Sequence, residues 1–189
     1  MSGGEITQDQ GPLLDFLRTP GVLGTETPKL IGTACAQVLL TGERAYKLKR
    51  AIRYDYLDFG TLEQRNAAVS AELTLNRRTA PDLYLGLLPV FAEGDGFRLG
   101  RLIEATDPGA VEHLIVMRRF NEDATFDRLV AVGQLTGHDL ERLADAIARF
   151  HAAAPAAPLE NASERLKRVS ARTMNEILAQ RDVIVQRVV

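Results

Sequence analysis

The sequence has 189 residues, of which 46% are apolar and 25% are charged, a composition typical of a folded globular protein. A formal net charge of -2 gives no electrostatic basis for nucleic acid as the main partner. The single cysteine, Cys35, excludes an internal disulfide, and three histidines without cysteine partners show no zinc-site spacing. No apolar run approaches the ~20 residues of a membrane helix, and the N-terminus lacks the pattern of a secretory signal, so we expect a cytoplasmic protein without membrane contact.

The first part of the chain is predicted to be an extension with one short helix. Residues 1–11 are polar and rich in glycine, and we expect them to be frayed. Residues 12–18 (PLLDFLR) predict a helix that ends at Pro20-Gly21. Three short strands at 29–31, 37–40 and 45–52, joined by tight turns, then predict an antiparallel meander.

After residue 60 the apolar spacing changes from that of a strand to that of a helix. Thr61 with Gln64 three residues later is a capping-box signature, and the helix is expected to reach Arg78 before Pro81 ends it. Strands are predicted at 83–91, 97–104 and 110–120, and a hairpin turn joins the first two.

Beyond residue 120 the pattern predicts only helices, at 125–132, 140–151 and 163–180. The middle helix is expected to bury a stripe made of Leu140, Leu143, Ala144, Ile147 and Phe150. Three strands, one helix, three strands and then helices predict an α+β fold, which excludes the strand-helix alternation of a Rossmann domain.

The predicted strand at 45–52 alternates apolar residues with lysines. Ala45-Tyr46-Lys47 has the A-x-K spacing of the strand lysine that contacts nucleotide phosphates in protein kinases, where a helix glutamate holds the lysine. Glu72 is the better partner, because Glu63 in the first helical turn is explained by the helix dipole. The residues alone favour the other interpretation, a solvated lysine, because exposed strand lysines and helix-surface glutamates are common.

Five pieces of the sequence follow one another between about residue 28 and about residue 155: LTGERAYKLK, LDFGTLE, ELTLNRRTAPDLYLG, VMRRF and LADAIARFHAAA. In this order they resemble a bacterial family of aminoglycoside-phosphotransferase-like kinases. In many members of that family this part is fused to a C-terminal P-loop ATP-binding domain.

The resemblance implies a protein-kinase-like fold in three parts. Residues 1–27 would be an extension, residues 28–120 a nucleotide-binding N-lobe, and residues 121–189 a hinge and partial helical C-lobe. Lys47 and Glu72 are implied as the phosphate-side lysine and its glutamate. The resemblance implies that Ile31, Val38, Ala45 and Val116 line the rest of the ATP pocket. It implies a hinge formed by Met117, Arg118, Arg119 and Phe120.

Two departures from kinase patterns limit the expected activity. The turn at 32–36 has one glycine, so it is not a G-x-G-x-x-G loop. The sequence also has no H-G-D-like catalytic loop with a downstream asparagine and no metal-binding aspartate after it. Asp139 follows His138, but we interpret it as a helix cap. We therefore predict no catalytic residue and no metal ligand in this chain, and expect Mg²⁺ only with the missing C-lobe.

These observations predict the ATP-binding portion of a truncated small-molecule phosphotransferase, whose hydroxyl acceptor would bind in the full-length protein. One alternative is a non-catalytic, kinase-like interaction module that docks a partner through its helical C-terminal part. Another is an α+β domain of unrelated ancestry. The apolar ending, DVIVQRVV, predicts a partner surface and self-association through that tail.

Overall fold

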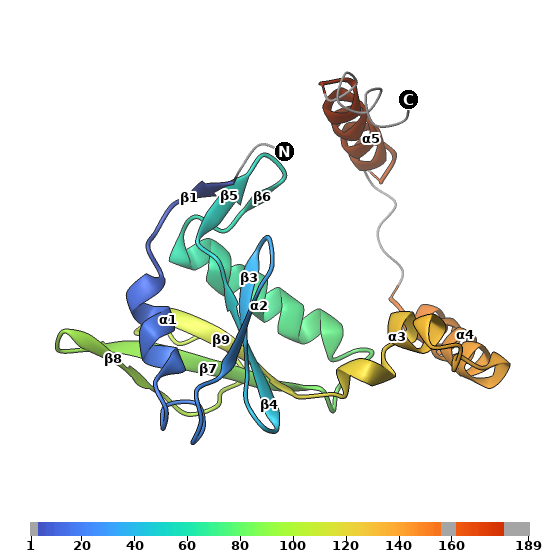
Figure 1. Ribbon diagram of the computed structural model, residues 1–189. Helices are drawn as coiled ribbons and strands as arrows, with labels where there is room; N and C mark the ends of the chain where they lie inside the picture. The colour runs from blue at the N-terminus through green and yellow to red at the C-terminus, as the bar shows by residue number, and fades with distance from the viewer. Residues whose placement is uncertain (1–3, 156–161, 180–189) are drawn as a thin grey trace, which may run out of the picture. The chain divides into compact units, whose positions relative to one another are not determined.

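The structure, a computed structural model, describes residues 4–155 and 162–179 (Figure 1). The chain divides into two compact units, residues 1–142 and residues 143–189. Within the described residues, none of the helices combines the length and the hydropathy that a membrane span requires.

The main element of the first unit is a six-stranded antiparallel sheet, in the order β2-β3-β4-β9-β7-β8. The strands are β2 (Lys29–Gly32), β3 (Ala36–Leu40), β4 (Arg44–Lys49), β7 (Tyr84–Glu93), β8 (Gly96–Leu99) and β9 (Glu112–Arg118). Strands β2, β3 and β4 pair in sequence order, which confirms the predicted meander. Together with the helices this makes the fold α+β, as the element order predicts.

A second, small sheet has the order β1-β5-β6. Its strands are β1 (Glu5–Ile6), β5 (Ile52–Tyr54) and β6 (Leu57–Asp58). The expectation that the first residues are frayed is wrong for residues 4–11, because β1 pairs with β5 and Thr7 N–H donates to the Ala51 carbonyl. The predicted strand at 45–52 is two strands, since the chain leaves the main sheet after Lys49.

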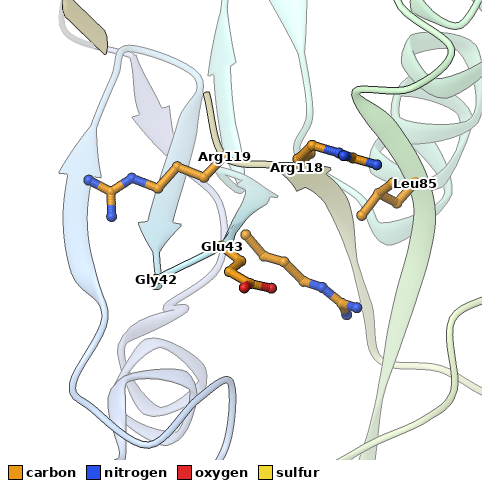
Figure 2. Close-up of a pocket in the computed structure, with 6 residues that line it drawn as sticks. Gly42, Glu43, Leu85, Arg118 and Arg119 are labelled. Carbon is orange, nitrogen blue, oxygen red and sulfur yellow. The ribbon is translucent and has the colours of Figure 1, made fainter. Parts of the chain in front are cut away.

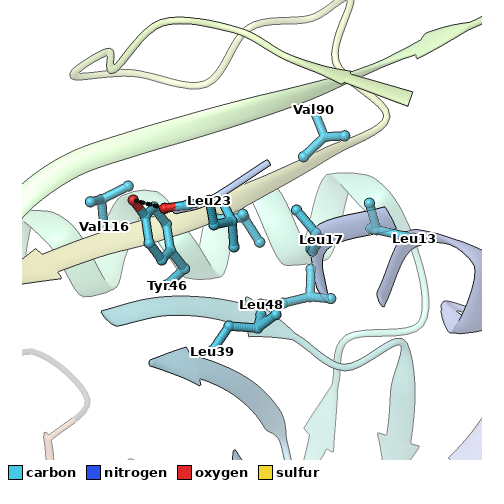
Figure 3. Close-up of a cluster of buried hydrophobic side chains, with 9 residues drawn as sticks. Leu13, Leu17, Leu23, Leu39, Tyr46, Leu48, Val90 and Val116 are labelled. Atoms are coloured by element: carbon cyan, nitrogen blue, oxygen red, sulfur yellow. Dashed lines mark hydrogen bonds between the residues drawn. The ribbon is translucent and has the colours of Figure 1, made fainter. Parts of the chain in front are cut away.

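Helix α1 (Gly11–Arg18) covers one face of the main sheet. Its Leu13 and Leu17 are buried against side chains of several strands, and Figure 3 shows this cluster. The Tyr46 hydroxyl lies in the cluster and donates to the Leu23 carbonyl at 3.4 Å. Helix α1, which lies in the predicted N-terminal extension, is therefore part of the core of the first unit.

Helix α2 (Leu62–Asn76) covers the opposite face, because its buried residues pack on side chains that alternate with those of the α1 cluster. Val69 and Leu73 contact Leu87 and Ile115. The helix begins with the predicted capping box, in which the Thr61 hydroxyl accepts from Gln64 N–H and the Gln64 side chain accepts from Thr61 N–H.

The remaining helices are η1 (Glu122–Ala124), α3 (Phe126–Ala131), α4 (Gly137–Ala153) and α5 (Ala162–Ala179), close to the predicted ranges. Asp139 accepts from Thr136 N–H at 3.0 Å, which confirms its role as a cap. The expected burial of the α4 stripe is wrong, since Leu140, Leu143 and Ile147 are 51%, 41% and 45% exposed. Helical spacing puts these residues on one side of α4, but burial also needs a second surface packed against that side.

Candidate functional site

Strand β4 separates its side chains by face. Tyr46 and Leu48 point into the α1 cluster and are almost fully buried. Lys47 and Lys49 therefore lie on the α2 face. The Lys49 side chain is 8% exposed and that of Lys47 is 26% exposed, so the alternating pattern does not form a solvated lysine face.

One carboxylate holds both lysines. The Nζ of Lys47 lies 2.7 Å from Oε1 of Glu72, and the Nζ of Lys49 lies 2.6 Å from Oε2. The Glu72 side chain is only 12% exposed. The ion pair between Lys47 and Glu72 that the resemblance implies is thus formed, and it is one of two ion pairs in a three-residue cluster.

Lys49 is the member of this cluster that the sequence reasoning missed. Its ammonium group also lies 5.0 Å from the centre of the Phe59 ring, a cation–π distance. The available signal was the spacing of two residues between Lys47 and Lys49, which puts both side chains on one face of a strand.

The position of Glu72 follows from how α2 is held. Val69 and Leu73 fix the middle of the helix on the sheet, and Glu72 precedes Leu73 in that turn. Burial raises the pKa of Glu72, but hydrogen bonds and charge from Lys47 and Lys49 outweigh burial and hold this pKa below its usual value. Glu72 is therefore ionised at neutral pH, and the cluster is charged.

A second buried polar group fixes the beginning of α2. Arg65 is fully buried and donates through Nε to Glu112 Oε2 at 2.8 Å. Its other nitrogens donate to the Phe59 carbonyl and to Gln8 Oε1, and Gln10 donates to Glu112. Nothing in the sequence distinguishes Arg65 from a surface helix arginine.

The strand register places four of the other predicted pocket residues on the Lys47 face. Val38 is the direct partner of Lys47 on one side and of Ile31 on the other. Ala45 is paired with Met117. Ile31, Val38 and Met117 are half-buried, so they leave apolar surface next to the lysine.

Val116 and the two arginines do not fit that pocket. Val116 and Arg118 pair with Tyr46 and Arg44, so their side chains lie on the α1 face, and Val116 is buried there. The Arg119 guanidinium donates to the Thr41 carbonyl at the β3–β4 turn. We leave Val116 and Arg118 out of the candidate site, because a side chain on one face of a sheet does not line the other. Arg119 is left out because its guanidinium is bound at the β3–β4 turn.

The turn between β2 and β3 is closed by its own hydrogen bonds. Thr33 N–H donates to the Ala36 carbonyl, and Ala36 N–H donates to the Thr33 hydroxyl. Arg50 donates to the carbonyls of Thr33 and Ala34, both at 3.1 Å. These contacts hold the one-glycine turn in place next to the Lys47 strand.

A hollow of about 530 Å³ lies elsewhere, at the β3–β4 turn and the end of β9 (Figure 2). Its lining is Gly42, Glu43, Arg44, Leu85, Arg118 and Arg119. Figure 2 shows Arg119 extending away from Arg118. Neither Lys47 nor Glu72 lines this hollow, and we take the charged cluster as the candidate site because it is desolvated and carries excess charge.

Among the described residues, no group of three or more histidine, cysteine, aspartate or glutamate side chains is placed to hold a metal ion. The candidate site is cationic and suits an anionic ligand.

Comparison with known proteins finds uncharacterized mycobacterial relatives. One from Mycobacterium tuberculosis (strain H37Rv) and one from Mycobacterium bovis (strain AF2122/97) are each 34% identical over 121 residues, which is 63% of this chain. The match spans about a fifth (21%) of the length of each relative. No protein-family profile and no solved structure matches the chain.

Proposed function

We propose that this chain is the ATP-binding portion of a small-molecule phosphotransferase of the aminoglycoside-phosphotransferase-like class, and that it is not catalytically competent by itself. The observation that carries the proposal is Lys47, a half-buried lysine held at 2.7 Å by Glu72 on one face of an antiparallel sheet. A partly desolvated cation aimed by a carboxylate is suited to the charge of nucleotide phosphates.

The fold supports the same function. Strands β2, β3 and β4 form a meander, and α2 follows it and packs across the same face as Lys47. This is the strand-lysine and helix-glutamate arrangement that the kinase resemblance implies. The apolar surface of Ile31, Val38 and Met117 beside Lys47 suits the nucleoside part of ATP.

In such an enzyme the phosphoryl group passes in line to an acceptor hydroxyl, and the protein contributes positioning and charge neutralisation. Lys47 would position the phosphate chain of ATP. The 189 residues contain no H-G-D-like loop, so proton removal from the acceptor and Mg²⁺ binding would belong to other residues of a complete enzyme. The acceptor would be a small-molecule hydroxyl.

A titration with a non-hydrolysable ATP analogue, followed by amide NMR shifts, tests this function. We expect shifts in β3, β4 and β9, and at least tenfold weaker binding in Lys47→Met and Glu72→Gln. Lys167→Met is the matched control, because it removes the same charge from an exposed position on α5. If saturating analogue moves no signal in the wild-type chain, the nucleotide-binding function is wrong.

The exposed apolar side chains of α4 favour the alternative function, a non-catalytic module that docks a partner. Leu143 and Ile147 lie one turn apart on α4 and both are exposed. The expected self-association through residues 182–189 lies outside the described residues. With a second copy of this chain as the partner on the α4 surface, Leu143→Glu combined with Ile147→Glu is expected to abolish self-association in size-exclusion chromatography and to leave analogue binding unchanged.

A further inference from the structure

We propose that Lys49 is a positioning residue for a polyanionic ligand at Lys47, and that its charge, without contact to the ligand, sets the affinity for a phosphate chain. The inference rests on the proposed function and deepens it, because it adds Lys49 as the residue that sets the affinity of Lys47 for the phosphate chain.

The charges of the cluster do not cancel. Lys47 and Lys49 together bring two positive charges, and Glu72 brings one negative charge. In the described part of the chain no second carboxylate lies within ion-pair distance of either ammonium. A simple Lys47–Glu72 pair would be neutral, whereas this cluster keeps one positive charge in a largely buried position. Such a charge favours an anionic third partner.

The two lysines have different access to a ligand. The Lys49 side chain is 8% exposed, and its Nζ is held between Glu72 Oε2 and the Phe59 ring, so it is not available to a ligand. The Lys47 side chain is 26% exposed, and its Nζ makes one hydrogen bond within the described residues. An ammonium group has three donors, so Lys47 has donors left for phosphate oxygens.

Lys49 also determines where Glu72 points. With Oε2 held at 2.6 Å by Lys49, Oε1 is directed at Lys47. Without Lys49 the carboxylate would have one partner and more rotational freedom, and the positive charge of Lys47 would be cancelled by Glu72. The loss of Lys49 is therefore expected to weaken anion binding, because Lys47, which contacts the ligand, then has its charge cancelled by Glu72.

The test compares affinities of inorganic pyrophosphate, ATP and adenosine for the wild-type chain and for Lys49→Met, Lys49→Arg and the control Lys167→Met. We expect Lys49→Met to weaken the binding of pyrophosphate and ATP about tenfold, because the loss of one positive charge near a partly buried anion site lowers the electrostatic attraction. The affinity for adenosine, which carries no charge, should not change. Lys49→Arg should restore most of the affinity, and Lys167→Met should have no effect. Methyl signals of Val69, Leu73 and Ile115 report whether α2 keeps its packing.

The outcomes separate this inference from the proposed function. If the wild type binds ATP and Lys49→Met binds pyrophosphate and ATP with the same affinity as the wild type, the role of Lys49 is wrong and the proposed function stands. If Lys49→Arg keeps the packing of α2 but does not restore the affinity, the inference is also wrong, because the positive charge at position 49 then does not set the affinity. Binding of pyrophosphate without ATP supports the anion site and contradicts the nucleotide function, and binding of neither ligand contradicts both.

Discussion

Arg65 and Glu112 form an ion pair that solvent does not reach, with the Nε of Arg65 2.8 Å from Oε2 of Glu112 and side-chain exposures of 0% and 2%. The pair joins α2 to β9, the strand that runs next to the lysine strand. Burial raises the pKa of Glu112, and the charge of Arg65 only partly offsets burial. The position of α2, and with it that of Glu72, depends on this pair.

Removal of Arg65 alone is expected to destabilise the fold strongly. In Arg65→Met the buried carboxyl of Glu112 loses its cation, and we expect a loss of about 3–5 kcal/mol in the free energy of unfolding. The double variant Arg65→Met with Glu112→Leu should recover most of this loss, because both charges are then replaced by apolar groups. Urea unfolding of the two variants and the wild type measures how far the effects of the Arg65 and Glu112 substitutions on stability depend on each other. A double variant as unstable as Arg65→Met would contradict the electrostatic explanation.

The N-terminal segment is expected to stabilise the same region through Gln10. Its Nε2 donates to Glu112 Oε2 and to the Lys49 carbonyl, and its Oε1 accepts from Ala51 N–H. Gln10→Ala removes these bonds at once, so we expect a loss of about 1–3 kcal/mol in urea unfolding. Gln134→Ala, at an exposed position, is the control and should change stability by less than about 0.5 kcal/mol. Equal effects of the two variants would show that the segment is not part of the cooperative fold.

His113 is expected to make the fold less stable as the pH falls. Its Nδ1 lies 2.8 Å from Asn66 Oδ1, and its Nε2 accepts from Asp107 N–H, so the neutral ring with a proton on Nδ1 satisfies both contacts. Burial lowers the pKa of His113 below its usual 6.5, although the charge of Asp107 partly opposes this. The unfolded chain then takes up a proton before the folded chain does. The stabilisation is complete above about pH 6.5 and is lost as the pH falls towards the folded-state pKa.

Urea unfolding between pH 7.5 and pH 5 checks this expectation, with His113→Gln as the comparison because glutamine does not titrate there. We expect the wild type to lose more stability over this interval than the variant. Parallel curves would exclude His113 as the source of the pH dependence.

Gly86 is expected to tolerate no side chain. It lies at a register shift between β7 and β9 with a φ of 155°, and a Cβ there would lie 2.8 Å from the backbone carbonyl oxygen of Ile103. We expect Gly86→Ala to cost about 1–3 kcal/mol, because strain and a backbone clash add. Gly42→Ala is the matched control, since a Cβ there meets nothing within 4 Å and its φ is not in the left-handed region. Similar melting temperatures for both variants would contradict this explanation.

Part of the candidate site could be predicted from the sequence. The A-x-K spacing and the helix after the capping box offered Lys47 and Glu72 as candidates, because both features are local. The resemblance to the kinase-like family then favoured their pairing over a solvated lysine. The prediction of Val116 as part of the ATP pocket lacked the strand register, which puts Val116 opposite Tyr46 on the other face. One residue along β9, Ile115, is the actual partner of Lys47.

The charged residues of the interior were less accessible to sequence reasoning. Lys49 and Arg65 have the residue types and local patterns of surface positions. They are buried in the structure because each forms an ion pair, Lys49 with Glu72 and Arg65 with Glu112. The opposite error concerns α4, where Leu140, Leu143 and Ile147 have the spacing of a buried stripe and are exposed. Periodicity reports which residues share a side, and burial depends on what packs there.

By itself the sequence determined most helices, the β2-β3-β4 meander, the hairpin turn between β7 and β8 and the caps at Thr61 and Asp139, because backbone preference and side-chain capping act over a few residues. Only the tertiary structure decided that Glu72 binds two lysines, that Arg65 is buried with Glu112, and that Leu13 and Leu17 belong to the core. These relationships join residues far apart in the chain, and the energy of a charge depends on which groups surround it after folding.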